Sequence, residues 1–140
     1  MAQVTAIWQR EDLLLEGETD TGNRVVMDSS PGAGGKNRGP RPMQMILMGL
    51  AGCTAMDVIS ILQKKREPLQ DLQVVVTAEQ AEGHPKVFTK FHIEYIVRGA
   101  VNEKSLQRAI ELSEQTYCPA QAMLRQAAPI STSYRIEAAA

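Results

Sequence analysis

Two cysteines, Cys53 and Cys118, are the residues of this 140-residue chain best suited to chemistry. Free cysteine is among the most frequently buried residue types and most often only packs, so packing is one interpretation. The other is a redox pair that alternates between dithiol and disulfide, since two packed helices could bring the thiols within disulfide reach. In a reducing compartment disulfides are usually of this transient kind.

The local sequence around each cysteine favours the redox interpretation. Gly49 and Gly52 lie close to Cys53, and glycines within a helix are tolerated where another helix or a substrate approaches the backbone. Cys118 directly precedes Pro119, so we expect it at the N-terminus of a short helix. Unpaired N–H groups at such a terminus favour a thiolate and predict a lowered pKa for Cys118.

A metal site is not expected. His84 and His92 lie between the two cysteines, and these four residues could supply four zinc ligands. No two of them are spaced as the CxxC or HxxxH pairs that zinc sites use. We therefore expect both histidines at the surface and no bound metal.

The composition is that of an ordinary globular chain. Hydrophobic residues make up 44% and charged residues 22%, and the length predicts one domain spanning residues 1–140. A net charge of −1 and 4% aromatic residues oppose binding to nucleic acid or to anionic lipid. The first eight residues lack the basic and apolar regions of a signal peptide, so we expect a cytoplasmic protein with reduced thiols.

The elements that must position the cysteines begin with a predicted antiparallel meander of three strands. Apolar residues and turn signals place these strands at residues 4–8, 13–15 and 24–28. Half of residues 29–42 are Gly or Pro, so neither a helix nor a strand persists there. This loop is either a solvated linker or a mobile flap whose Arg38 and Arg41 face an active site.

Residues 43–62 predict a helix that is buried on nearly all faces, because their only charge is Asp57. The length approaches that of a membrane span, but the interior carboxylate and the basic residues beyond both ends oppose that interpretation. One chain of this size can hardly cover such a helix, so we expect a second subunit. Asp57 lies one turn beyond Cys53, and we expect it to be structural, paired with a basic group or capping a polar contact.

The C-terminal half is expected to contain a hairpin, two helices and a last strand. The predicted ranges are 72–79 and 90–98 for the hairpin, 102–117 and 119–127 for the helices, and 131–137 for the strand. The main element order is β-β-β-α-β-β-α-β, which is an α+β pattern.

Two segments together resemble the OsmC/Ohr superfamily of osmotically inducible and organic-hydroperoxide-resistance proteins. The run GPRPMQMILMGLAGCTAMDVISIL from Gly39 to Leu62 is similar to the central helix of that family, and Tyr117-Cys118-Pro119-Ala120 is similar to its second cysteine segment. Within the superfamily, the chain most resembles the YhfA-like branch. The resemblance implies antiparallel sheets wrapped around a central buried helix, in an intertwined homodimer.

The resemblance also implies an activity, that of a thiol peroxidase that reduces organic hydroperoxides in oxidative-stress defence. Cys53 would be the thiol that attacks the peroxide, and Cys118 would resolve it to a disulfide. An external dithiol would then reduce that disulfide. The resemblance implies no cofactor.

One position departs from the family pattern. The well-characterised branches have a glutamate beside the proline that opens the central helix, whereas Pro42 is followed here by Met43 and Gln44. The family's arginine is not assigned either, and its candidates are Arg24, Arg38 and Arg41. Arg38, Arg41 and Gln44 are therefore candidates for activating Cys53 or for facing the substrate. The alternative is a non-enzymatic or weakly active dimeric stress or binding protein that lacks the activating carboxylate.

Overall fold

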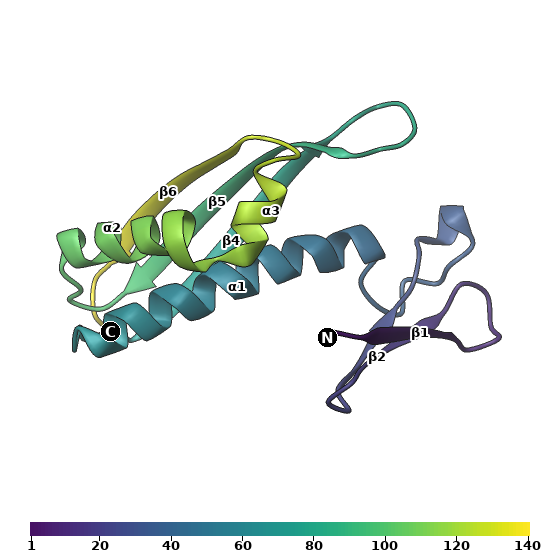
Figure 1. The fold of residues 1–140 in the computed structure, drawn as a ribbon, viewed down its shortest axis with the longest axis horizontal. Helices are drawn as coiled ribbons and strands as arrows, with labels where there is room; N and C mark the ends of the chain where they lie inside the picture. The colour runs from purple at the N-terminus through teal and green to yellow at the C-terminus, as the bar shows by residue number, and fades with distance from the viewer. The chain divides into compact units, whose positions relative to one another are not determined.

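The computed structural model describes residues 1–140 and divides them into two compact units, residues 1–46 and 47–140. Helix α1 (Pro42–Lys64) begins in the first unit and continues in the second. Each unit contains a three-stranded sheet (Figure 1). A single domain over residues 1–140 stays a prediction.

The first unit contains the predicted antiparallel meander, made of β1 (Val4–Trp8), β2 (Leu15–Thr19) and β3 (Arg24–Met27). The second strand begins later than its apolar run predicts. Arg10 and Asp12 both have positive φ and form the turn after β1, so pairing resumes only at Leu15, opposite Trp8.

The second unit contains a sheet in the order β4-β5-β6. Helical segments connect β5 to β6 along the chain. The remaining elements are β4 (Asp71–Gln80), β5 (Phe88–Arg98), α2 (Glu103–Leu112), a π-helical turn (Ser113–Tyr117), α3 (Pro119–Leu124) and β6 (Ile130–Glu137). The hairpin of β4 and β5 is antiparallel, as predicted. The expectation of antiparallel pairing is wrong for β6, which runs parallel to β5. The helices between β5 and β6 return the chain to the end of the sheet at which β5 begins. Strand β6 therefore runs in the same direction as β5.

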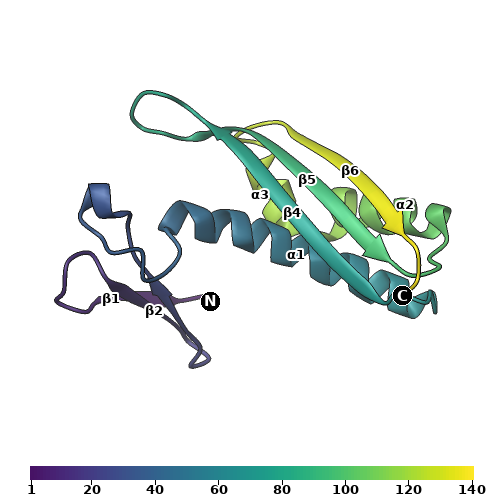
Figure 2. The same ribbon diagram turned by 180° about the vertical axis from the view of Figure 1, so that it is seen from behind.

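The helices of the second unit cover one face of its sheet (Figure 2). Phe91, Ile93, Tyr95 and Val97 alternate along β5 and are fully buried on that face. They meet the buried stripe of α1, which recurs every fourth residue at Leu50, Thr54, Val58 and Leu62. Each fully buried large apolar side chain stabilises such a core by roughly 1.5–3 kcal/mol.

Within the chain, α1 is buried on one face only, and Met48 and Met56 remain 54% and 73% exposed. The helix is long and apolar enough to cross a membrane by length and composition. That evidence is weak, because the core helix of a soluble protein passes the same test.

Candidate functional site

The two cysteines lie next to each other in the unit formed by residues 47–140. Cys53 is on α1 and is half-buried, whereas Cys118 follows the π-helical turn and is buried. Neither is in a disulfide, and the Cys53 thiol is near enough to raise the pKa of the Cys118 thiol. The structure thus brings together the two residues that the sequence singled out.

Cys118 is held at the N-terminus of α3, as the proline after it predicts. Its sulfur accepts a hydrogen bond from the backbone N–H of Gln121 (3.4 Å), and its own N–H donates to the carbonyl of Ser113 (2.8 Å). The π-helical turn between Ser113 and Tyr117 widens the end of the preceding helix. Such turns are frequent at functional sites.

The pKa of the Cys118 thiol is raised to about 11, chiefly by burial and to a smaller extent by the nearby Cys53 thiol, although the hydrogen bond from Gln121 lowers it. The expected lowering by the helix N-terminus is therefore wrong. The physical reason is that Cys118 is only 3% exposed, and desolvation of a thiolate outweighs the N-terminal donors of a six-residue helix. The Cys118 thiol accordingly keeps its proton at neutral pH.

A buried hydrogen-bond network centred on Thr54 adjoins the cysteines. The hydroxyl of Thr54 contacts the hydroxyl of Tyr95 (2.6 Å), the hydroxyl of Ser113 (2.9 Å) and the side-chain amide N–H of Gln121 (3.1 Å). These four side chains are each 0% exposed. They come from α1, β5, the π-helical turn and α3, so one hydroxyl joins four elements.

Sequence reasoning missed this network, although a signal was available. Thr54 occupies the same helical stripe as the apolar core residues of α1, and Tyr95 takes an inward position on β5. Ser113 continues the buried face of α2. Polar residues at predicted core positions must be hydrogen-bonded, so these three predict partners for one another.

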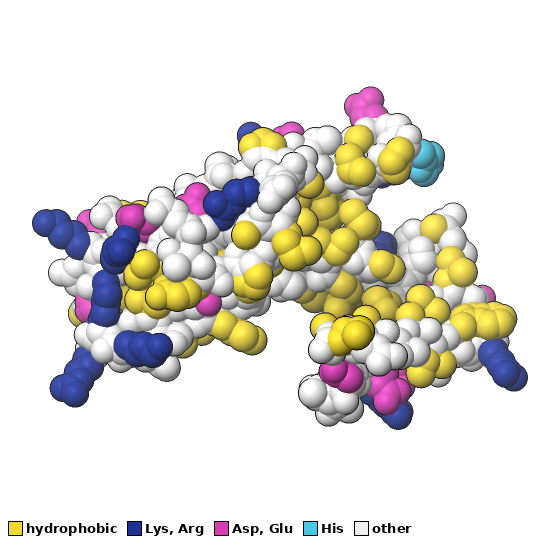
Figure 3. All heavy atoms as spheres, viewed as in Figure 1, with side chains coloured by type: hydrophobic (Ala, Val, Ile, Leu, Met, Phe, Trp, Pro, Cys, Tyr) yellow, Lys and Arg dark blue, Asp and Glu magenta, His cyan; other side chains and the backbone are white.

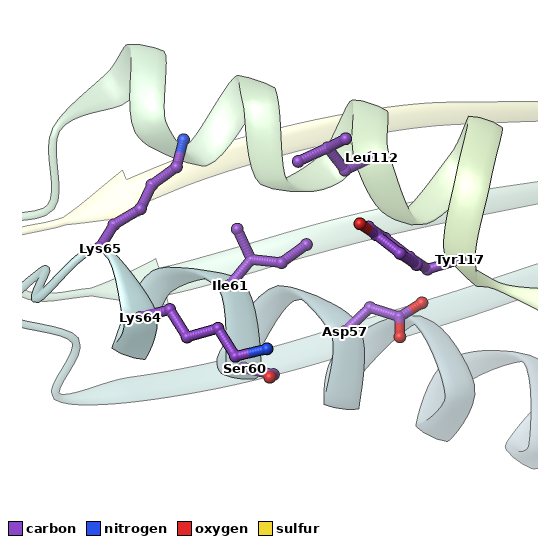
Figure 4. Close-up of a pocket in the computed structure, with 7 residues that line it drawn as sticks. All are labelled: Asp57, Ser60, Ile61, Lys64, Lys65, Leu112 and Tyr117. Atoms are coloured by element: carbon purple, nitrogen blue, oxygen red, sulfur yellow. The ribbon is translucent and has the colours of Figure 1, made fainter.

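Asp57 connects this network to a surface pocket. Its carboxylate accepts a hydrogen bond from Ser113 (2.9 Å), so it caps a polar contact, as predicted. The pocket has a volume of about 440 Å³ and is lined by Asp57, Ser60, Ile61, Lys64, Lys65, Leu112 and Tyr117. Figure 4 shows Asp57 and Tyr117 near one end, Lys65 at the other, and the apolar side chains of Ile61 and Leu112 between them.

Neither cysteine lines the pocket, but each is close in sequence to a residue that does. Asp57 lies one helical turn after Cys53, and Tyr117 directly precedes Cys118. The end of the pocket opposite Asp57 is basic. Lys and Arg side chains gather there, where α1 ends and α2 begins (Figure 3).

Arg38 lies in the first unit, where its guanidinium contacts carboxylates of Asp28 (2.9 Å), Glu11 (3.1 Å) and Asp12 (3.4 Å). Asp28 is buried and also accepts backbone N–H bonds from the loop that follows it. The hydrogen bond from Arg38 holds the pKa of Asp28 well below its usual range. These contacts give Arg38 a structural role in the loop, and its role at a reaction centre stays a prediction.

Gln44 caps the start of α1. Its side-chain oxygen accepts the backbone N–H of Arg41 (2.9 Å), which is the arrangement of one half of a capping box. The Arg41 side chain has no carboxylate within ion-pair distance. Both residues belong to the first unit, and their roles toward Cys53 stay predictions.

Comparison with known proteins gives a consistent set of relatives. Residues 34–133 match the family described as OsmC-like protein. Protein YhfA of Escherichia coli K12 is 38% identical over 130 residues, which cover 92% of this chain and 94% of YhfA. A hypothetical protein from Aquifex aeolicus VF5 superposes with a TM-score of 0.86 at 26% identity, covering 100% of this chain and 98% of that one.

A more distant structure shares the fold alone. The organic hydroperoxide resistance protein OsmC from Legionella pneumophila has a TM-score of 0.70 and 16% identity, covering 96% of both chains.

We predict that alkylation of Cys118 by iodoacetamide in the native protein rises with pH toward about 11, because burial raises the pKa of this thiol. In urea the profile should fall to the ordinary value near ~8.5, since burial is lost. The raised pKa also means that the protonated thiol stabilises the fold below the unfolded pKa and that this contribution is lost as pH rises toward 11. Peptide mapping by mass spectrometry resolves Cys118 from Cys53. A native profile at or below the urea profile would contradict the assigned environment.

We predict that Thr54→Val destabilises the protein more than Tyr95→Phe does. The valine leaves the Tyr95 hydroxyl and the Gln121 amide without their acceptor, at about 1–3 kcal/mol for each buried donor. Tyr95→Phe removes one hydrogen bond and leaves Thr54 with a second donor, so it should lower the free energy of unfolding by about 1 kcal/mol. Urea denaturation measures both. Equal losses would show that Thr54 is not the centre of the network.

Proposed function

This chain belongs to the OsmC-like protein family, in its YhfA-like branch, and we propose that it is a thiol-dependent peroxidase that reduces organic hydroperoxides in oxidative-stress defence. The observation that carries the proposal is the pair of free cysteines, with the half-buried thiol of Cys53 next to the buried thiol of Cys118. The name of the Legionella pneumophila protein, which refers to organic hydroperoxide resistance, supports the substrate class.

Cys53 performs the first step because it is the more accessible of the two thiols. Its thiolate sulfur attacks the terminal oxygen of the hydroperoxide, so that a sulfur–oxygen bond forms while the oxygen–oxygen bond breaks. The alkoxide takes up a proton and leaves as the alcohol. Sulfur supplies the electron pair, so Cys53 is oxidised to a sulfenic acid and the hydroperoxide is reduced.

Cys118 performs the second step from its protected position. Its sulfur attacks the sulfenic sulfur of Cys53, a disulfide forms, and hydroxide leaves with the proton of the Cys118 thiol as water. An external dithiol then reduces the disulfide by thiol–disulfide exchange. The cycle balances with one hydroperoxide and one dithiol, and we place it in the cytoplasm, where dithiol reductants are present.

The pocket lined by Asp57 and Tyr117 suits the organic part of the substrate. Ile61, Leu112 and the ring of Tyr117 offer apolar surface, and an alkyl or aryl group that rests there gains by leaving water. The hydroperoxide group would then lie toward Asp57, which is the end nearest Cys53.

Arg41, Arg38 and Gln44 are the candidates for activating Cys53; the guanidinium of Arg41 has no ion-pair partner in the chain, whereas that of Arg38 binds three carboxylates. Gln44 cannot hold an arginine by charge, and its oxygen caps α1. The lack of charge on Gln44 and its capping role favour the alternative function, a dimeric stress or binding protein with little or no peroxidase activity.

We also propose that the protein is a homodimer in which the exposed side of α1 meets its symmetry mate. Met48, Gly52 and Met56 follow one another at four-residue spacing on α1, with the two methionines largely exposed. A Cβ added at Gly49 or Gly52 would meet nothing within the chain, so the helix surface is open there. Small residues beside methionines allow two helices to approach closely and bury apolar area.

We predict that the reduced protein consumes cumene hydroperoxide continuously when dithiothreitol is present. Cys53→Ser should reduce consumption to the rate of buffer with dithiothreitol, because the attacking sulfur is gone. Cys118→Ser is the matched control: it should still consume one equivalent without dithiothreitol and leave a Cys53 sulfenic acid that dimedone traps. If both cysteines of the native protein stay reduced in excess peroxide, the alternative function is correct.

We predict that Met56→Glu converts the dimer to a monomer, since a carboxylate in an apolar helix contact lacks a partner. Met123→Glu is the matched control, because Met123 is also 73% exposed but lies on α3. Light scattering should give twice the chain mass for the native protein and for Met123→Glu, and the chain mass for Met56→Glu. A native monomer, or a dimer that survives Met56→Glu, would contradict the proposed interface.

A further inference from the structure

The hydrogen bonds around Thr54 have a fixed direction, which the carboxylate of Asp57 sets. Asp57 only accepts, so the single hydroxyl proton of Ser113 is used on it. Thr54 must therefore donate to Ser113, and its own proton is then used as well. It follows that Tyr95 and Gln121 both donate to Thr54. The Thr54 hydroxyl makes one donated and two accepted bonds, which is its full capacity.

Two of these bonds lead from the neighbour of Cys53 to Cys118. Thr54 follows Cys53 on α1, and its partner Ser113 receives the backbone N–H of Cys118 on its carbonyl (2.8 Å). The other partner, Gln121, donates its backbone N–H to the sulfur of Cys118 (3.4 Å). The turn that carries Cys118 is thus tied on both sides to the residue beside Cys53.

The hydrogen bond from Ser113 to Asp57 (2.9 Å) also joins α1 to the turn that carries Cys118, and it shares its Ser113 hydroxyl with the Thr54 network. The rest of the core is apolar, and apolar contacts are not directional, so they fix one helix along another less firmly than a saturated hydrogen-bond node does. Disulfide formation does not tolerate such shifts, because it needs sulfurs about 2.05 Å apart and Cα atoms about 5.5 Å apart.

We propose that Thr54 is a positioning residue that sets the spacing of Cys53 and Cys118, and hence how readily they form a disulfide. This inference rests on the proposed redox pair, but not on the identity of the peroxide. The hydroxyl of Thr54 makes no hydrogen bond to either sulfur. It acts through Ser113 and Gln121, which hold Cys118 in place.

The carbonyl oxygen of the Gln121 side chain supports a role beyond stability. It is buried and has no hydrogen-bond partner, although an unpaired buried acceptor costs about 1–3 kcal/mol. All hydroxyl protons of the network are directed toward Asp57, so none is left for this oxygen. The position of the Gln121 side chain is therefore set by the hydrogen bond that it donates to Thr54, since its carbonyl oxygen has no partner.

The test measures the equilibrium between the protein dithiol and oxidised glutathione, which yields the protein disulfide and two molecules of reduced glutathione. This equilibrium constant is the effective concentration of the cysteine pair. Thr54→Val should lower it by roughly tenfold or more, because effective concentration depends steeply on geometry. Thr54→Ser keeps the hydroxyl and should restore the constant to near the native value.

Val58→Ala is the control for loss of stability, because Val58 is fully buried one turn further along the same face of α1 and belongs to no hydrogen-bond network. It should weaken the fold and leave the glutathione constant unchanged. If Thr54→Val fails to fold by circular dichroism, Gln121→Met removes one of the two connections and should give an intermediate loss.

The positioning role is overturned if Thr54→Val has the same glutathione equilibrium constant as the native protein. It is also overturned if Val58→Ala lowers that constant as much as Thr54→Val does. A native protein that forms no disulfide with glutathione also overturns it. Loss of peroxide consumption with the glutathione result intact rejects the peroxidase and supports the positioning role, so the two failures are distinguishable.

Discussion

The hydroxyl group of Thr54 is the interaction on which the unit of residues 47–140 depends. Apolar burial holds its sheet and helices together, but burial is not directional and does not fix one helix along another. A buried hydroxyl with three partners does, because each partner that moves away is left unsatisfied in a dry environment. The same node lies one residue from Cys53, so the constraint that orders the core also orders the thiols.

Burial distinguishes two cysteines of identical chemistry. Cys118 is enclosed and keeps its proton near Cys53, whereas Cys53 is partly open. A thiol that is protected from solvent and held beside an accessible one is suited to resolve a sulfenic acid rather than to meet a peroxide. This difference in burial supports the division of roles that we propose for the two cysteines.

Much of the fold could be predicted from the sequence, because alternation along β5, the apolar run of α1 and the proline after Cys118 are local signals. The direction of β6 could not, since a strand has the same alternation whether its neighbour is parallel or antiparallel. The Thr54 network joins residues 41 to 67 positions apart, so it required the topology. The raised pKa of Cys118 required its burial, which no spacing rule supplies.

We propose that Cys53 and Cys118 are a redox pair driven by organic hydroperoxide. The decisive measurement adds one equivalent of cumene hydroperoxide to the reduced protein, without other thiols, and maps its peptides by mass spectrometry. A redox pair should yield a linked pair of peptides containing Cys53 and Cys118, lighter than the separate peptides by two hydrogen atoms. Unlinked, fully reduced peptides with the hydroperoxide still present would contradict it.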